Sequence, residues 1–311
     1  MIELFKIEIS RMKQVILFLI VVVLFSYGCS MSTTKRATFS AKSDDSSVYS
    51  YRLKRMFEVE GRQGIATDGQ YYYVSGSTAL YKYSKDVKLL LKNEKPFINF
   101  EKPANHIGDI DVYNGEIFAG CETFIDGRGI NIQIAIYDSK TLEYKRSIDF
   151  HPDSGQEEVS GITVDKDREA LWMTDWVDGS HIYQYDLKSG AYIGKSLLLP
   201  APENQQGIFY WDGNLYITAD DGDAEYDEHD HMYRVEIDPS ETAAQVTLEK
   251  TFTEVKRTGE IEGLTMDPTT DELLVLFNRG ARIILGMPKG FYPGYDREIH
   301  EVYVYDMSKK R

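Results

Sequence analysis

The sequence predicts an all-β fold, and three observations support that prediction. Short runs rich in β-branched and aromatic residues recur along the chain, and turn-forming Gly, Asp and Ser residues separate them. One stretch, from Gly161 to Leu199, contains four such runs within about 40 residues. The same order of runs recurs in four other stretches of the chain. Together these observations predict a repeated unit of four antiparallel strands joined by hairpins.

The copies are recognised by their first strand. In the reference stretch the four expected strands are Ile162–Val164, Ala170–Thr174, His181–Tyr185 and Ala191–Leu199. Glycine followed by an apolar residue opens the first strand of three further copies, at Gly64-Ile65, Gly207-Ile208 and Gly263-Leu264. In the remaining copy, Gly108-Asp109-Ile110, Asp109 is expected to stand where the others have Ile or Leu. Five such copies predict a β-propeller with five blades of four antiparallel strands.

The two ends of the repeat predict how the ring closes. The last copy stops after its third strand, at Asp306, and a strand-like run from Tyr51 to Glu60 precedes the first copy without a place in it. An open last blade would present a bare sheet edge, which promotes aggregation. We therefore expect Tyr51–Glu60 to be the fourth strand of the last blade. A six-bladed ring is the alternative, if the segment from Asn278 to His300 contains a further blade.

The N-terminal segment has the features of a targeting signal. Lys6, Arg11 and Lys13 precede an apolar run from Val15 to Phe25. This run is shorter than the roughly 20 residues that span a bilayer, but it suits the core of a signal peptide. A small residue directly before Cys29 is similar to the bacterial lipoprotein cleavage box. We expect residues 1–28 to be a lipoprotein-type signal peptide and Cys29 to be lipidated; a secretory signal without lipid or an uncleaved anchor is the alternative.

The remaining chain divides into a linker and one domain. Residues 29–49 are rich in Ser, Thr, Lys and Asp, so we expect a flexible tether followed by a propeller domain at 50–311. Cys29 and Cys121 are the two cysteines of the sequence, which excludes a disulfide framework. We expect a monomer in the bacterial cell envelope, either lipid-anchored or periplasmic or extracellular, which contacts the membrane through its lipid alone.

The charge of the chain narrows the range of partners. The sequence has 50 acidic and 35 basic side chains, a formal net charge of −15. Phosphate backbones and anionic lipid surfaces attract basic proteins, so this balance argues against nucleic acid and against direct binding to anionic membranes. The remaining partners are an unidentified ligand or an envelope protein.

Loop length predicts which face carries a binding site. In a propeller, the loops between second and third strands lie on the same face as the segments that lead into the innermost strands. Three of these loops are longer than a hairpin needs: Cys121–Asn131, Asp220–Asp230 and Asn278–His300. Long loops of this kind are usually functional. We expect the ligand-binding face to include His106, Asp175, Trp176, Gln206, Asp220, Asp221, Asn278 and Arg279.

Carboxylates near the innermost strands predict a second kind of site. Asp109, Glu158 and Glu262 are expected to converge at the mouth of the axial channel, where they could hold Ca²⁺ or another divalent metal. The alternative is that polar residues hold water in a channel too narrow for a ligand. The acidic loop from Asp220 to His231 lacks the twelve-residue calcium-loop pattern and is interpreted as a solvated loop. The sequence contains no nucleophile elbow, phosphate-binding loop or His-Glu-x-x-His sequence.

Three phrases of the chain resemble a known superfamily. GITVDKDREALWMTDW, HIYQYDLKSG and IEGLTMDPTTDELLVLFNRG look like blades of the broad group that includes NHL-type, YVTN-type and gluconolactonase-like propellers. The resemblance covers about residues 51 to 307 and implies the β-propeller fold. Gluconolactonase-like members hold a central divalent metal with carboxylate and amide side chains. The resemblance implies Asp109, Glu158 and Glu262 for these positions, with Gln206 as an amide ligand.

Two functions from different classes follow. The first is a secreted or lipid-anchored propeller that binds a ligand or protein partner on the face with the long loops. The second is a metal-dependent hydrolase, similar to lactonases or glycosidases, that uses the carboxylates at the channel mouth. One fold can carry many unrelated functions, so the sequence leaves open whether the protein is an enzyme.

Overall fold

The computed structural model describes residues 46–226, 228–238, 241–255, 258–284 and 287–310. This part of the chain is built of β-strands, with one 3₁₀ turn, η2, at Pro152–Ser154. Residues 1–45 lie outside it, so the signal peptide, the lipidated Cys29 and most of the tether stay predictions. Among the residues described, no helix is both long enough and apolar enough to cross a membrane.

Two sheets contain four strands each in chain order. Their orders are β2-β3-β4-β5 and β6-β7-β8-β9, and every neighbouring pair is antiparallel. The bounds are β2 Gly64–Thr67, β3 Tyr71–Gly76, β4 Ala79–Ser84, β5 Leu89–Asn93, β6 His106–Tyr113, β7 Glu116–Ile125, β8 Arg128–Asp138 and β9 Tyr144–Asp149. Each sheet is the four-stranded meander that the sequence predicts, and we refer to such a unit as a blade.

The next two blades form one eight-stranded sheet. Its order is β10-β11-β12-β13-β17-β16-β15-β14. The bounds are β10 Ile162–Asp165, β11 Ala170–Met173, β12 His181–Asp186, β13 Tyr192–Leu199, β14 Gln205–Trp211, β15 Asn214–Ala219, β16 His231–Glu236 and β17 Ala243–Thr251. The outermost strands β13 and β17 pair in parallel, with Leu197 beside Ala243 and Leu199 beside Gln245. This pairing joins the two blades, which the sequence repeat did not predict.

The last sheet contains both ends of the domain. Its order is β1-β22-β19-β18, with bounds β1 Tyr49–Val59, β18 Ile261–Met266, β19 Glu272–Arg279 and β22 Ile299–Lys309. β1 pairs with β22 in antiparallel register, from Tyr49 opposite Lys309 to Val59 opposite His300. The predicted closing strand is therefore confirmed, and it begins two residues earlier than expected.

Glu249 in β17 fixes the beginning of β1. Its fully buried carboxylate accepts the backbone N–H groups of Val48 and Tyr49 at 3.0 Å and the hydroxyl of Tyr51 at 2.9 Å. The Arg234 guanidinium lies 3.4 Å from the same carboxylate. A buried charge is tolerated only with such partners. The contact therefore ties β1 to the neighbouring blade as well as to β22.

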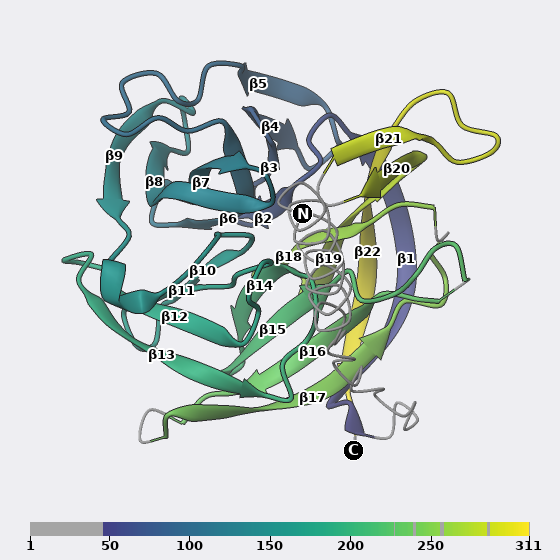
Figure 1. Ribbon diagram of the computed structural model, residues 1–311. Helices are drawn as coiled ribbons and strands as arrows, with labels where there is room; N and C mark the ends of the chain where they lie inside the picture. Colours follow the sequence, from purple (N-terminus) through teal and green to yellow (C-terminus); the bar gives the residue numbers. More distant parts are fainter. Residues whose placement is uncertain (1–45, 227, 239–240, 256–257, 285–286, 311) are drawn as a thin grey trace, which may run out of the picture. The chain divides into compact units, whose positions relative to one another are not determined.

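The blades surround a common centre. Figure 1 shows β2, β6, β10, β14 and β18 innermost and β5, β9, β13, β17 and β1 outermost, and the inner strands contact one another in cyclic order. Five apolar clusters each lie between neighbouring blades; one packs Trp172 against Ile208, and another packs Tyr72 against Leu274. Burying one such side chain stabilises the fold by about 1.5–3 kcal/mol. The ring is thus a β-propeller held together by side-chain packing at each junction.

Asp109 occupies the centre of the ring, in a register that differs from the expectation. Ile110 pairs with Ala119 as Ile65 pairs with Val74, so Ile110 is the apolar residue of its copy and Asp109 stands where the other copies have Gly. The expected alignment of Asp109 with Ile or Leu was therefore wrong by one position, because β6 has a bulge between Ile107 and Ile110.

The glycines of other blades make room for the Asp109 carboxylate. A Cβ at Gly64 or Gly263 would lie 2.5 or 2.0 Å from its Oδ1, and one at Gly207 would lie 2.9 Å from its Oδ2. The N–H of Ile110 donates to Oδ1 at 2.8 Å. Burial raises the pKa of this carboxyl well above its ordinary value, and the Ile110 hydrogen bond offsets part of that effect. The repeated glycines thus serve close packing at the centre.

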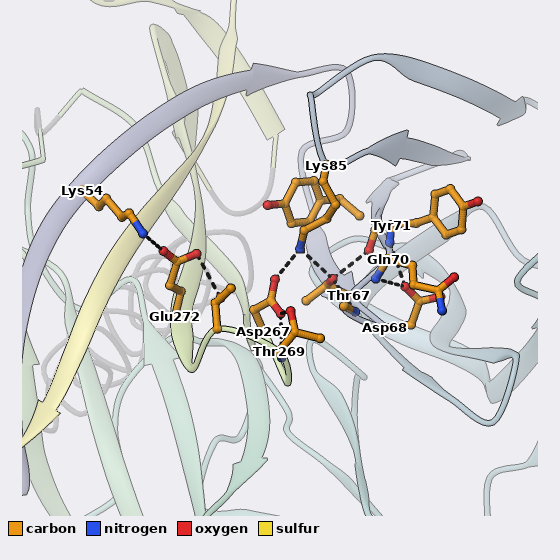
Figure 2. A network of polar contacts seen from close by, with 12 residues as sticks. Lys54, Thr67, Asp68, Gln70, Tyr71, Lys85, Asp267, Thr269 and Glu272 are labelled. Carbon is orange, nitrogen blue, oxygen red and sulfur yellow. Dashed lines mark hydrogen bonds and ion pairs between the residues drawn. The ribbon is translucent and has the colours of Figure 1, made fainter.

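A polar network joins the first and last blades at the turns after their innermost strands (Figure 2). Lys85, which follows β4 in the blade of β2 to β5, donates to Asp267 and lies 3.5 Å from the Thr67 hydroxyl. Thr269 donates to the same Asp267 through its N–H at 2.9 Å and its hydroxyl at 2.7 Å. These contacts reinforce the junction that the N-terminal strand closes, away from the long loops.

Two of the predicted long loops contain strands. Cys121–Asn131 is a hairpin, because β7 continues to Ile125 and β8 begins at Arg128. Within Asn278–His300, β20 (Ala281–Ile284) and β21 (Met287–Phe291) form a two-stranded sheet. That pair is a projecting hairpin rather than a further four-stranded blade. The third long segment, Asp220–Asp230, connects β15 to β16.

Candidate functional site

A cavity of about 100 Å³ opens where the long hairpins and the segments leading into the innermost strands meet. It has room for a few waters or for the end group of a larger molecule. It is lined by Arg62, Gln63, Ser77, His106, Phe124, Glu158, Ser160, Trp176, Gln206, Glu260, Glu262 and Ile283. Each blade contributes at least one polar residue just before or within its innermost strand.

Irregular pairing at the start of the innermost strands positions several of these side chains. The register shifts between Ile107 and Ile110, between Gln205 and Gly207, and between Ile261 and Leu264. A bulge turns a side chain that regular alternation would place elsewhere. Gln206 and Glu262 lie within two of these irregular steps and line the cavity.

His106, Glu122 and Glu158 form the tightest group of titratable side chains. One ligand atom from each lies within 4.8 Å of the other two, the one such His/Cys/Asp/Glu group found in the described part of the chain. His106 Nδ1 is 3.1 Å from Glu122 Oε1, and His106 Nε2 is 3.1 Å from Gln63 Oε1. Burial raises the pKa of Glu158 well above its ordinary value, and the neighbouring Glu122 carboxylate raises it further. We call these three residues the His106 trio.

A second polar group, around Arg62, also lines the cavity. The Arg62 guanidinium is 3.2 Å from Glu260 Oε2 and 3.5 Å from Glu298 Oε1. Asn278 donates to Glu262 and to the backbone oxygen of Arg62 at 2.9 Å. Burial raises the pKa of Glu262 well above its ordinary value; Glu260 adds to this and Arg62 opposes it. Acids outnumber cations here, so the cavity favours a proton or a positively charged group.

The structure places the residues predicted for the metal site in three different surroundings. Glu158 belongs to the His106 trio, Asp109 lies at the centre among the glycines, and Glu262 is held by Asn278. Glu262 and Asp109 are close enough for their charges to interact. A site made of these three residues stays a prediction.

Of the predicted ligand-binding residues, His106, Trp176 and Gln206 line the cavity. Asp175 is buried behind it and accepts the N–H groups of Glu157 and Val177 at 2.7 and 2.8 Å, so it shapes the loop that carries Trp176. Asn278 supports Glu262 in a similar way.

The other three predicted ligand-binding residues, Arg279, Asp221 and Asp220, are absent from the cavity lining. Arg279 forms a two-point ion pair with Glu301 at 2.8 and 3.0 Å. Asp221 lies 2.8 Å from His231 Nδ1. Burial raises the pKa of Asp220 well above its ordinary value, and Asp230 raises it further. The structure therefore gives Arg279 and Asp221 other contacts and does not bring any of the three into the cavity.

Glu122 is the site residue that the sequence did not indicate. It follows the apolar run of β7 and is fully buried. In the sequence, the feature that could have indicated Glu122 is a charged residue directly after Cys121, in a segment that was interpreted as a loop. Phe124, in the segment Cys121–Asn131, and Ile283, in the segment Asn278–His300, form part of the cavity wall.

Comparisons with known proteins identify the fold. The sequence matches no protein-family model and no curated protein. The structure is similar to the glutaminyl cyclase of Myxococcus xanthus, with a TM-score of 0.54 and 10% identity over 84% of this chain and 97% of that one. At this identity, the similarity supports the propeller fold alone.

Two further structures show weaker similarity. The PQQ-bound aldose sugar dehydrogenase of Streptomyces coelicolor has a TM-score of 0.45 and 13% identity over 82% of this chain and 98% of that one. U3-55K has a TM-score of 0.46 and 10% identity, covering 81% and 98%.

Proposed function

We propose that the protein binds the positively charged end of a small molecule or peptide in the cavity at the mouth of the propeller. The observation that supports this most directly is convergence: all five blades supply polar side chains to one cavity. Structural water alone would not need aromatic walls, and Trp176 and Phe124 provide them as an edge-to-face pair with ring centroids 6.4 Å apart. Concave sites with a few convergent polar groups are the usual form of ligand sites.

The charge of the cavity indicates the kind of ligand. Glu158, Glu260 and Glu262 line it, whereas Arg62 is its one guanidinium and is already paired with Glu260. Aromatic faces also attract cations. An ammonium or guanidinium group would lower the cost of ionising these buried acids. The apolar part of the ligand would lie outward, near Ile125 and Ile130 at the hairpin tip, which are 53% and 52% exposed.

A thermal-shift screen tests this proposal. The purified protein is melted with amines, guanidinium compounds, amino acids, neutral sugars and carboxylic acids, because a ligand of the native state raises the midpoint by mass action. We expect cationic compounds to raise it, and Trp176→Ala to remove the shift. Leu90→Ala, on an outer strand and 46% exposed, is the matched control. Stabilisation by anions alone, or shifts that survive Trp176→Ala, would contradict the proposal.

A metal-dependent hydrolase is the second candidate, and the His106 trio is the observation that favours it. A divalent metal, when bound, would polarise a carbonyl group or a water molecule. Lactone and glycoside substrates should then be hydrolysed in the presence of the metal and not after chelation. An absence of turnover with any metal would leave the binding function.

We also propose that the domain is anchored in the cell envelope through lipid on Cys29. The support is the sequence of the leader alone, since Cys29 lies outside the described residues. Replacing it by Cys29→Ser should release the protein from the membrane fraction. Unchanged membrane association in that variant would indicate an uncleaved anchor instead.

A further inference from the structure

We propose that His106, Glu122 and Glu158 bind a divalent transition metal, with an open coordination position facing the cavity. Their ligand atoms lie within 4.8 Å of one another, a spacing that one cation can bridge after small side-chain rotations. The trio differs from the metal site predicted from the sequence, because only Glu158 is shared. This inference deepens the hydrolase candidate by locating its metal, but metal binding itself does not require any organic ligand.

Each of the three side chains is oriented by a hydrogen bond to a group outside the trio. Glu122 Oε2 accepts the N–H of Val159 at 3.0 Å, which leaves Oε1 facing His106. Glu158 Oε2 accepts the N–H of Trp176 at 2.7 Å. The Nε2 of His106 lies 3.1 Å from Gln63 Oε1, which can accept its proton while Nδ1 acts as the ligand. Outer partners of this kind are typical of metal sites, where they fix the ring tautomer and the carboxylate orientation.

Burial distinguishes the closed side of the trio from the open side. Glu122 is fully buried, and a Cβ at Gly129 would lie 2.3 Å from its Oε2, so the chain at that position approaches the carboxylate closely. His106 and Glu158 line the cavity, whereas Glu122 does not. A cation among them would be enclosed from the Glu122 side and reachable from the cavity. Three protein ligands with one accessible position are the pattern of catalytic rather than structural sites.

The donor atoms select the metal. One imidazole nitrogen and two carboxylate oxygens suit Zn²⁺, Mn²⁺ or Fe²⁺. Ca²⁺ and Mg²⁺ prefer oxygen donors only, and Ca²⁺ requires six to eight of them. The trio should therefore bind Zn²⁺ or Mn²⁺ more tightly than Ca²⁺ or Mg²⁺, which narrows the range of metals that the sequence allowed.

The test is metal binding by the purified, chelator-treated protein without any organic ligand. Calorimetric titration with Zn²⁺, Mn²⁺, Ca²⁺ and Mg²⁺ gives affinity and stoichiometry, and the visible absorption of bound Co²⁺ reports nitrogen and oxygen coordination. We expect one equivalent of Zn²⁺ or Mn²⁺ to bind, and Glu122→Gln or His106→Gln to weaken binding by more than about 100-fold. Glu116→Gln is the matched control and should retain the affinity, because Glu116 lies at the other end of β7, outside the cavity lining, and pairs with Arg146 at 2.7 Å.

Three results would overturn the proposal: no binding of any of the four metals, undiminished binding in the Glu122→Gln and His106→Gln variants, or an equal loss in Glu116→Gln. Melting each variant without metal shows whether it is folded, and the two trio variants provide independent tests. If metal binding fails while cationic ligands still stabilise the protein, the metal site is refuted and the proposed ligand site stands. If both fail, the ligand proposal is refuted separately.

Discussion

Replacing His300 with Gln should reduce the sensitivity of the protein to mild acid. His300 lies in β22 with 15% of its side chain exposed. Its Nδ1 is 2.7 Å from Asn278 Oδ1, and because the Asn278 amide nitrogen donates to Glu262, we assign Nδ1 as the proton donor to Oδ1. Burial, and then the charge of Arg62, lower the pKa of His300 to about 4. Glu58 opposes this shift, and Arg297 adds to it.

The magnitude follows from linkage. The pKa of His300 falls from the ordinary 6.5 to about 4 in the folded protein, so the unfolded chain binds this proton more readily. Stability from the neutral imidazole is complete above about pH 6.5 and is lost as the pH falls toward about 4. The full loss is about 3 kcal/mol, and about 2 kcal/mol of it should occur between about pH 7 and pH 4.5. Glutamine cannot titrate and should remove this contribution.

The assay is urea unfolding of both proteins at about pH 7 and pH 4.5, where the loss of stability in the wild type should exceed that in His300→Gln by about 2 kcal/mol. For each protein, the compared quantity is the change in unfolding free energy between the two pH values, so any cost of the substitution that does not depend on pH cancels. Equal losses in the two proteins would refute the assignment of a buried neutral imidazole. A larger loss in the variant would mean that the charged form is the one stabilised.

Three further predictions concern the ring. Gly263→Ala would place a Cβ 2.0 Å from Asp109 Oδ1, so urea unfolding should show a loss of about 1–3 kcal/mol; a change below about 0.5 kcal/mol would mean that the centre has free space. Glu249→Gln should cost about 1–3 kcal/mol, because one acceptor for the Tyr49 region becomes a donor, and unchanged stability would argue against the tie to β1. Deleting β1 should expose the edge of β22 and give insoluble or strongly destabilised protein, measured by yield and melting; normal folding would refute closure by this strand.

The fold was predictable because its signals are local. Turn-formers such as Asp186 to Gly190 separate the strands of the reference blade, and the observed strands agree with the expected ones within one or two residues. Closure by the N-terminal strand was predictable from the need to cover an open edge. The parallel pairing of β13 with β17 was not, because it depends on where two distant outer strands meet.

The site was predictable in part. Glu158 lies shortly before β10 and Gln206 at the start of β14, so their positions follow from the repeat. Glu122 joins the His106 trio only because β7 continues past Cys121 as a hairpin, and that length was interpreted as a loop. The register of Asp109 depends on a bulge, which adds a residue without a mark in the apolar pattern.

The parallel seam between β13 and β17 gives the ring an uneven response to thermal motion. Two neighbouring blades share a strand pairing there. Other junctions combine side-chain packing with single backbone hydrogen bonds near the axis, such as that from Asp109 N–H to Ser160 O at 2.7 Å and that from Gly263 N–H to Gln63 O at 2.9 Å. Sub-global opening follows the weakest cooperative boundary. The two blades should therefore exchange their amide protons as one block, while the ring separates elsewhere first. Glu158 lies just before the first strand of this block and His106 in the blade beside it. Backbone hydrogen bonds from Asp109 to Ser160 and from Gly129 to Glu157 cross the same junction, so the metal proposed there would reinforce a boundary that the main chain already bridges.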